Sequence, residues 1–143
     1  SVLSLKNATI YQEDKTILSN VNLEVNHGEF LYIIGKTGSG KSSLMKTLYA
    51  DLPLKEGNGH IVDFDLETLK ENDIPFLRRK IGIVFQDFKL LPDRSVFDNL
   101  DFVLNATGWK EKEERQTKID EVLAEAKTKN VNFKKDIYLH ILY

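Results

Sequence analysis

The sequence "GKTGSGKS" at residues 35–42 decides the fold. It follows the run "FLYII" at 30–34, which is apolar throughout and therefore predicts a strand buried on both faces. After it, apolar residues recur at helical spacing until Pro53, so a helix is expected to begin within the stretch. A glycine-rich loop between a buried strand and a helix is the context that a phosphate-binding loop requires.

The stretch matches the pattern G-x-x-x-x-G-K-[ST] through Gly35, Gly40, Lys41 and Ser42. Glycines permit positive φ and a close approach of the backbone, so the N–H groups of the loop can turn inward onto an anion. The first turn of the helix adds unpaired N–H groups and the positive end of its dipole. Lys41 is expected on the β- and γ-phosphates, and the Ser42 hydroxyl on Mg²⁺. The residues expected to bind the nucleotide in this loop are Gly35, Lys36, Thr37, Gly38, Ser39, Gly40, Lys41, Ser42 and Ser43.

Composition limits the remaining classes of function. A chain of 143 residues has the length of one domain. Its 20 basic and 22 acidic residues give a net charge of −2, which predicts no nucleic-acid binding. There is no cysteine for a disulfide or a thiolate metal site, and His27, His60 and His140 lie far apart. No uncharged apolar run approaches the roughly 18 residues of a membrane span, and no signal peptide is visible, so a soluble cytoplasmic protein is expected.

The flanking sequence predicts a sheet followed by helices. Apolar residues alternate at period two in 2–11 and 20–25, which indicates half-buried antiparallel strands. The segment 72–80 predicts a short helix, and "IGIVF" at 81–85 a second strand buried on both faces. From Ser95 onward the pattern is helical.

Two long stretches resemble ABC-type ATPases. The first, "ATIYQEDKTILSNVNLEVNHGEFLYIIGKTGSGKSSLMKTL", is similar to the opening of that family, and the resemblance implies that Tyr11 stacks on adenine. The second, "RRKIGIVFQDFKLLPDRSVFDNL", is similar to the Q-loop segment. There the amide oxygen of Gln86 would ligate Mg²⁺ while its NH₂ senses the attacking water or the γ-phosphate. Tyr11 packing into the core and Gln86 capping a strand are the alternatives. The expected cofactors are ATP and Mg²⁺, the catalytic residues Lys41 and Gln86, and the metal ligands Ser42 and Gln86.

The fold class implied by the resemblance is α/β. It comprises a P-loop NTPase core with an N-terminal antiparallel β subdomain and the start of a helical subdomain. We expect one incomplete domain over 1–143, with the β subdomain and core at 1–86, the Q-loop and helical subdomain at 87–129, and an atypical tail at 130–143. The family's L-S-G-G-Q signature, its Walker B strand ending in Asp-Glu and its switch histidine do not occur in the sequence. The tail is therefore expected to be a truncated or out-of-register end, and the two apolar runs are expected to lack a neighbouring strand.

Within the family, "FLRRKIGIVFQDFKLLPDRSVFDNL" is similar to the FtsE subfamily of cell-division ATPases, which works with the membrane protein FtsX. The resemblance implies an ATP-binding and ATP-hydrolysing subunit that forms a homodimer on ATP. It would lie at the inner face of the plasma membrane through an FtsX-like integral membrane protein. Residues 87–99 are expected to face that partner, and the residues expected in the contact are Phe88, Leu90, Leu91, Asp93, Arg94 and Phe97.

Three other functions are weighed against this one. Other ABC importers and lipoprotein exporters share much of the same pattern. A nucleotide-binding fragment or regulatory module without turnover would account for the missing catalytic glutamate. A small-metabolite kinase would need an Arg-rich lid, for which "FLRRK" is too short a match.

Overall fold

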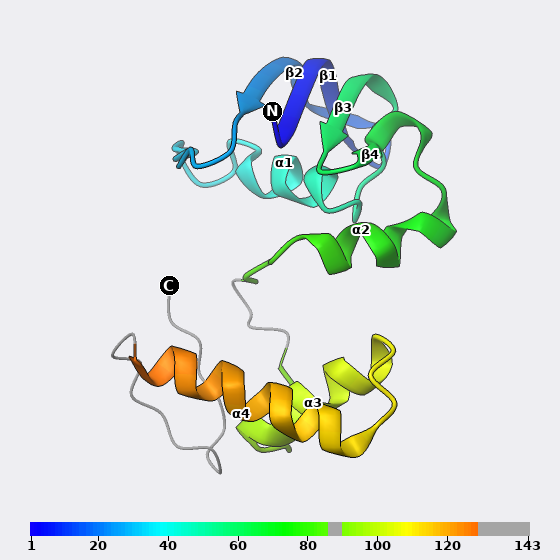
Figure 1. Cartoon of the computed structure of the whole chain (residues 1–143). Helices are drawn as coiled ribbons and strands as arrows, with labels where there is room; N and C mark the ends of the chain where they lie inside the picture. The colour runs from blue at the N-terminus through cyan, green and yellow to red at the C-terminus, as the bar shows by residue number, and fades with distance from the viewer. Residues whose placement is uncertain (86–89, 129–143) are drawn as a thin grey trace. The chain divides into compact units, whose positions relative to one another are not determined.

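The computed structural model describes residues 1–85 and 90–128 of the chain (Figure 1). The chain forms two compact units, Ser1–Gly82 and Ile83–Tyr143, and the second is described as far as residue 128. Each unit has its own secondary structure and its own buried residues.

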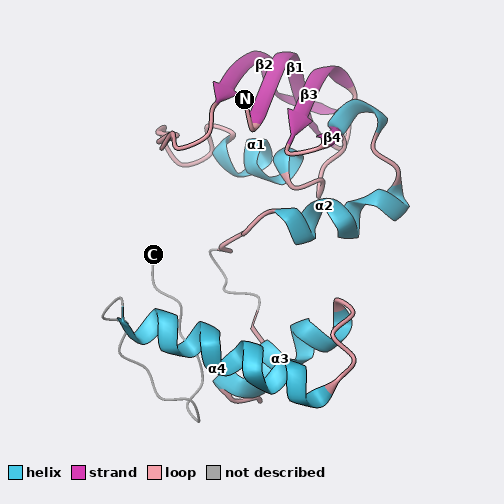
Figure 2. Ribbon diagram, viewed as in Figure 1, coloured by secondary structure: helices cyan, strands magenta, loops and turns pink. Residues whose placement is uncertain are grey.

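The first unit is built on a four-stranded antiparallel sheet with the strand order β2-β1-β3-β4 (Figure 2). Its strands are β1 (Leu3–Gln12), β2 (Lys15–Val25), β3 (Glu56–Ile61) and β4 (Phe64–Asp65). Leu3 pairs with Val25 and Leu5 with Leu23, so the period-two alternation places these side chains on one face. The two antiparallel strands expected ahead of the loop are confirmed, although β2 begins five residues earlier than the alternation indicated.

Helix α1 (Lys41–Leu48) contacts β1 and buries its apolar side against the sheet. The core of this unit consists of Leu5, Ala8, Ile10, Leu44, Leu48, Leu54, Ile61, Leu66 and Leu77. Full burial of one leucine contributes about 1.5–3 kcal/mol, so α1 is held mainly by Leu44 and Leu48 and little by the propensity of its eight residues.

Short helices connect the sheet to the end of this unit. The 3₁₀ turns η1 (Leu66–Thr68) and η2 (Glu71–Asp73) lead into α2 (Ile74–Lys80), which has Asp73 as its N-cap and a proline in its first turn. Helix α2 buries Leu77 completely, and the Arg78 Nε donates to the carbonyl oxygen of Tyr49 at 3.1 Å. The helix expected at 72–80 is therefore confirmed.

The two apolar runs at 30–34 and 81–85 are not strands, and here the sequence-based prediction was wrong. Among the residues that the structure describes, no strand pairs with either run. A segment that is apolar on both faces is buried only when it pairs with neighbouring strands and other elements pack on both faces. Without them its side chains stay exposed to solvent. The side chains of Phe30, Tyr32 and Ile34 are accordingly 81%, 79% and 89% exposed.

The second unit contains two helices, α3 (Val96–Ala106) and α4 (Lys112–Thr128). Ser95 caps α3, because its hydroxyl oxygen accepts from the backbone N–H of Asp98 at 3.1 Å. The Arg115 Nε donates to the Asp101 carboxylate at 2.7 Å and joins the two helices. Val96 in α3 and Ile119 in α4 are each only 1% exposed, so both helices bury an apolar side chain.

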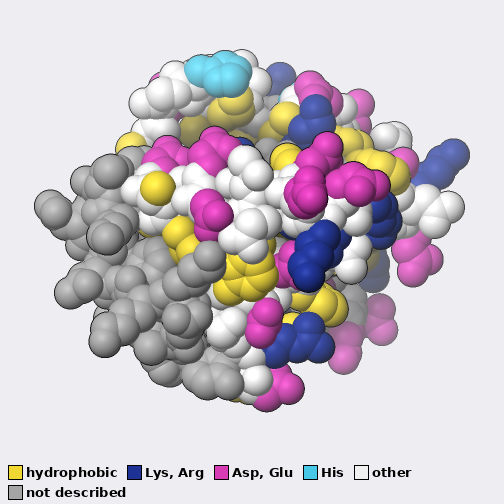
Figure 3. Space-filling model, turned by 60° about the horizontal axis from the view of Figure 1, so that its bottom comes forward, with side chains coloured by type: hydrophobic (Ala, Val, Ile, Leu, Met, Phe, Trp, Pro, Cys, Tyr) yellow, Lys and Arg dark blue, Asp and Glu magenta, His cyan; other side chains and the backbone are white. Residues whose placement is uncertain are grey.

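Charged side chains of both signs lie exposed among the described residues. On the face drawn in Figure 3, acidic and basic side chains lie among one another, and hydrophobic side chains come to the surface between them. In the described ranges, 1–85 and 90–128, no helix combines the length and the apolar character that a membrane crossing demands.

The hairpin of β3 and β4 contains a pair whose strength depends on pH. The Nδ1 atom of His60 lies 2.8 Å from the Asp65 carboxylate, and this hydrogen bond raises the pKa of His60 above its usual 6.5. A raised pKa means that the pair stabilises the folded chain fully below pH 6.5 and that the contribution is lost as the pH rises through the folded pKa. Proton NMR should show His60 titrating above 6.5 in the wild type and closer to that value in Asp65→Asn. Equal pKa values in the two proteins would refute the pairing.

Candidate phosphate-binding site

The loop at residues 35–40 connects the exposed run at 30–34 to α1 and takes a backbone path that favours glycine. Gly38 has φ 83° and Gly40 has φ 99°, both in the left-handed region. Gly40 is also the N-cap of α1, and its carbonyl oxygen accepts from the Leu44 N–H at 3.0 Å. A side chain at either position would be strained, because the Cβ of an L-residue crowds the backbone there.

Two of the glycines also leave no space for a side chain. A Cβ at Gly35 would lie 2.6 Å from the Ser39 Oγ. A Cβ at Gly40 would lie 3.0 Å from Ile17 Cγ2 and from Leu18 Cγ, both on β2. The loop therefore lies close to Ser39 at its first glycine and close to β2 at its last.

The ammonium group of Lys41 lies within the loop. Its Nζ donates to the carbonyl oxygens of Gly35 at 2.6 Å and Lys36 at 2.9 Å, and to the Ser39 Oγ at 3.3 Å. This places a cation beside the first turn of α1, where the unpaired N–H groups and the helix dipole are also positive. The arrangement can bind an anion with several oxygens, such as a polyphosphate.

Helix α1 is fixed in place behind the loop. Thr47 is 1% exposed, and its hydroxyl donates to the carbonyl oxygen of Ser43 at 2.9 Å. Ser43 is itself buried, so its side chain faces the core, whereas Ser42 is exposed at the start of the helix. Of the two serines, Ser42 therefore has the hydroxyl that an incoming metal ion could reach.

Tyr11 lies at the end of β1, where its backbone partner on β2 is Thr16. Its hydroxyl donates to the Glu56 carboxylate at 2.7 Å, and the Lys55 Nζ lies 5.9 Å from the ring centroid. The hydrogen bond to Glu56 raises the pKa of Tyr11 above 10.0. Because Gly40 rests on Ile17 and Leu18, the loop lies beside the same hairpin as Tyr11.

A shallow depression of about 380 Å³ adjoins Tyr11. It is lined by Asn7, Thr9, Tyr11, Thr16, Ser19, Asn20 and Glu56. The loop residues 35–43, all of which the structure describes, do not line it. The structure therefore brings Lys41 together with Gly35, Lys36 and Ser39, but it does not bring Tyr11 into the same cavity as the loop.

Part of the expected site falls outside the described residues, namely Gln86 and Phe88. Of the other residues expected to face a partner, Leu90, Leu91 and Phe97 are half-buried, and Asp93 and Arg94 are exposed. The Arg94 guanidinium lies 5.2 Å from the ring centroid of Phe102, which is a favourable cation–π contact.

Asn99 organises this segment, although no motif in the sequence pointed to it. Its side-chain oxygen accepts from the Leu91 N–H at 2.9 Å, and its NH₂ donates to the carbonyl oxygens of Leu91, Arg94 and Ser95. The residue is only 8% exposed, and four hydrogen bonds from one amide fix the turn ahead of α3. Only its place four residues after the Ser95 cap could have indicated this role.

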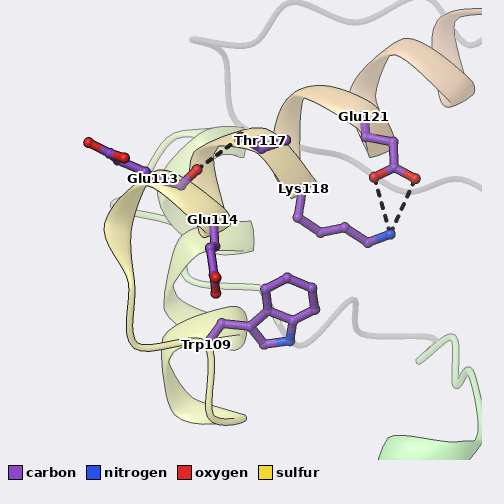
Figure 4. A pocket seen from close by; sticks show the side chains of 6 residues that line it. All are labelled: Trp109, Glu113, Glu114, Thr117, Lys118 and Glu121. Carbon is purple, nitrogen blue, oxygen red and sulfur yellow. Dashed lines mark hydrogen bonds and ion pairs between the residues drawn. The ribbon is translucent and has the colours of Figure 1, made fainter.

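A second depression, of about 480 Å³, lies on α4 beside Trp109 (Figure 4). The other residues that line it are Glu113, Glu114, Thr117, Lys118 and Glu121. Lys118 is paired with Glu121 at 3.3 Å, and the Thr117 hydroxyl donates to the Glu113 carbonyl oxygen. None of the residues expected to bind nucleotide occurs here.

Comparisons with known proteins match the chain to one family model and to several curated relatives. The family model described as "ABC transporter" matches residues 18–138. The cell division ATP-binding protein FtsE of Bacillus subtilis is 44% identical over 98 residues, and the FtsE of Streptococcus pneumoniae is 39% identical over 98 residues. Each alignment covers 68% of this chain and 43% of the relative, so the chain spans less than half the length of these relatives. The methionine import ATP-binding protein MetN of Clostridioides difficile is 32% identical over 131 residues, which is 90% of this chain and 41% of that protein.

Solved structures show the same fold. A dimeric ATP-binding cassette in a post-hydrolysis state with ADP and Pi matches with a TM-score of 0.77 and 31% sequence identity. The match covers 95% of this chain and 60% of that one. It bears out the α/β fold class with a P-loop core, an antiparallel β subdomain and the start of a helical subdomain.

The geometry of the loop distinguishes its two lysines. Lys41→Ala should weaken ATP binding by about 1.5–3 kcal/mol, because it removes a charge-assisted contact from inside the loop. Lys36→Ala is the matched control, since only its backbone carbonyl takes part in the loop. Isothermal titration calorimetry with ATP measures how much affinity each variant loses. Equal losses would show that the loop does not hold phosphate through Lys41.

Proposed function

Because this chain belongs to the ABC transporter family, we propose that it binds ATP with Mg²⁺ and forms part of the ATP-hydrolysing subunit of an ABC system. The observation that carries the proposal is the loop at 35–43, which combines left-handed glycines, an inward-turned ammonium group and a helix N-terminus. A Cβ at Gly35 would crowd the Ser39 Oγ and come within 3.7 Å of the Lys41 Nζ, so a glycine there lets the backbone stay close to the ammonium group that would meet the phosphates.

In the proposed function, the loop, the start of α1 and Tyr11 bind different parts of the nucleotide. Lys41 would exchange its bonds to the carbonyls of Gly35 and Lys36 for bonds to the β- and γ-phosphates. Mg²⁺, held by the exposed Ser42 hydroxyl and by Gln86, would neutralise charge on those phosphates. The N–H groups at the start of α1 would hold the phosphates in line, since the helix is fixed by its buried face. The ring of Tyr11 would stack on adenine, which binds the base at the hairpin beside the loop.

The similar proteins suggest a cellular role, a membrane partner and an oligomeric state for this chain. FtsE proteins are named for cell division, and we propose an FtsE-type role with an FtsX-like integral membrane protein, which would keep the chain at the inner face of the plasma membrane. The solved cassettes are dimers, so we propose a homodimer that closes on ATP. The match to MetN supports a second candidate, the ATPase subunit of an importer.

Two motifs that ABC ATPases use for hydrolysis, the L-S-G-G-Q signature and the Walker B strand ending in Asp-Glu, do not occur among these 143 residues. A carboxylate that positions the attacking water and the signature-motif donors on the γ-phosphate are each needed, and one such donor is worth about 2.7–4 kcal/mol. The 143-residue chain is therefore expected to show only background Mg²⁺-dependent phosphate release in a malachite-green assay. The same chain joined to a segment carrying L-S-G-G-Q and a Walker B strand should hydrolyse ATP.

Two outcomes of this assay would overturn the expectation. Turnover by the short chain that Lys41→Ala abolishes would mean that the chain itself supplies the missing carboxylate. ATP binding without turnover in the extended chain would favour the alternative function, a nucleotide-binding module that does not hydrolyse.

The membrane partner can be tested separately. The turn that Asn99 fixes presents Asp93 and Arg94 to solvent, beside the half-buried Leu90 and Leu91. A photo-crosslinking amino acid at position 90 or 94 should capture an FtsX-like membrane protein in cells. The same amino acid at position 14, in the exposed turn between β1 and β2, is the control. Capture from position 14 alone would reject this surface, and capture of an importer's membrane subunit would favour the MetN-like function.

A further inference from the structure

Glu56 contacts Tyr11 but has no role in the proposed function. Glu56 is the first residue of β3, and the register pairs it with Thr9 on β1. This pairing brings its carboxylate to the end of β1, where it accepts a hydrogen bond from the Tyr11 hydroxyl at 2.7 Å. The bond spans 45 residues of sequence and is therefore a product of the sheet.

Lys55, the residue before Glu56, lies near the ring of Tyr11. The Lys55 Nζ lies 5.9 Å from the Tyr11 centroid and donates to the Glu13 carbonyl oxygen at 3.4 Å. Tyr11 is half-buried, so its ring is held at the hydroxyl by Glu56 and near one face by Lys55. A tyrosine on a sheet surface has two soft torsions, and these contacts restrict both of them.

We propose that Glu56 is a positioning residue for the nucleobase, which holds the ring of Tyr11 in the orientation that stacks on adenine. The proposal rests on the proposed function, since it presumes that Tyr11 meets the base. Its physical basis is preorganisation: a ring that is already ordered loses no further rotamer freedom when the base binds. The hydrogen bond to Glu56 also raises the pKa of the Tyr11 hydroxyl, so the phenol keeps the proton through which it is held.

The test compares two ligands that share the phosphates and differ in the base. Isothermal titration with MgATP reports the phosphates and the base together, whereas magnesium tripolyphosphate reports the loop alone. Glu56→Ala should weaken ATP binding by about 2- to 12-fold, the equivalent of immobilising one side chain, and leave tripolyphosphate binding unchanged. Glu56→Gln keeps an acceptor oxygen for the hydroxyl and should retain most of the affinity for ATP.

Two further variants separate positioning from other effects. Tyr11→Ala should weaken ATP binding at least as much, and Glu56→Ala added to it should cost nothing more, because Glu56 acts only through Tyr11. Glu24→Ala removes an exposed carboxylate from β2 of the same sheet and should change neither ligand.

The outcomes are distinguishable. Equal weakening of both ligands by Glu56→Ala, additive losses with Tyr11→Ala, or no effect on ATP would each overturn the role of Glu56. A wild type that binds tripolyphosphate as tightly as ATP would overturn it as well and leave the phosphate-binding loop standing. A wild type that binds neither ligand would reject the proposed function itself.

Discussion

The candidate phosphate-binding site depends on one constraint. The backbone between Gly35 and Lys41 has to wrap around the bound anion and yet be held in a fixed conformation. Left-handed torsions at Gly38 and Gly40 give the turn, and they are available at no steric cost only without a Cβ. A free glycine-rich loop would lose much entropy on binding, so its ends have to be fixed by the rest of the fold. The contact of Gly40 with Ile17 and Leu18 fixes one end, and the fit of Ser39 against Gly35 closes the other.

The antiparallel sheet serves this loop by holding α1. An isolated helix of eight residues is unstable in water, so its position comes from the burial of Leu44 and Leu48 against the sheet. The buried Thr47 ties the helix to its own first turn through the Ser43 carbonyl. The positive end of α1 and the Lys41 ammonium group therefore occupy a defined place before any anion arrives. Electrostatic preorganisation of this kind is what a phosphate-binding site needs.

The sequence was sufficient where local signals decide the structure. Alternation indicated β1 and the part of β2 from residue 20, the glycine spacing indicated a loop ahead of α1, and Pro75 and Ser95 marked two helix starts. The sequence-based prediction failed at 30–34 and 81–85, because apolar composition shows only that a segment could be buried. The missing Walker B strand had already indicated that both runs lack a neighbour, and without one neither run pairs as a strand. The Tyr11–Glu56 bond and the four hydrogen bonds of Asn99 depend on register and on a folded turn, and no local pattern in the sequence encodes them.

The central claim is that residues 35–43 form the phosphate-binding loop through their backbone N–H groups. The most direct measurement is a ¹⁵N–¹H NMR titration of the 143-residue chain with magnesium tripolyphosphate and with MgATP. The account predicts that both ligands move the amide signals of Gly38, Gly40, Lys41 and Ser42 downfield, because each N–H exchanges a weaker acceptor for a charged oxygen. Unchanged signals across 35–43 at saturating ligand, or shifts confined to the sheet, would contradict it.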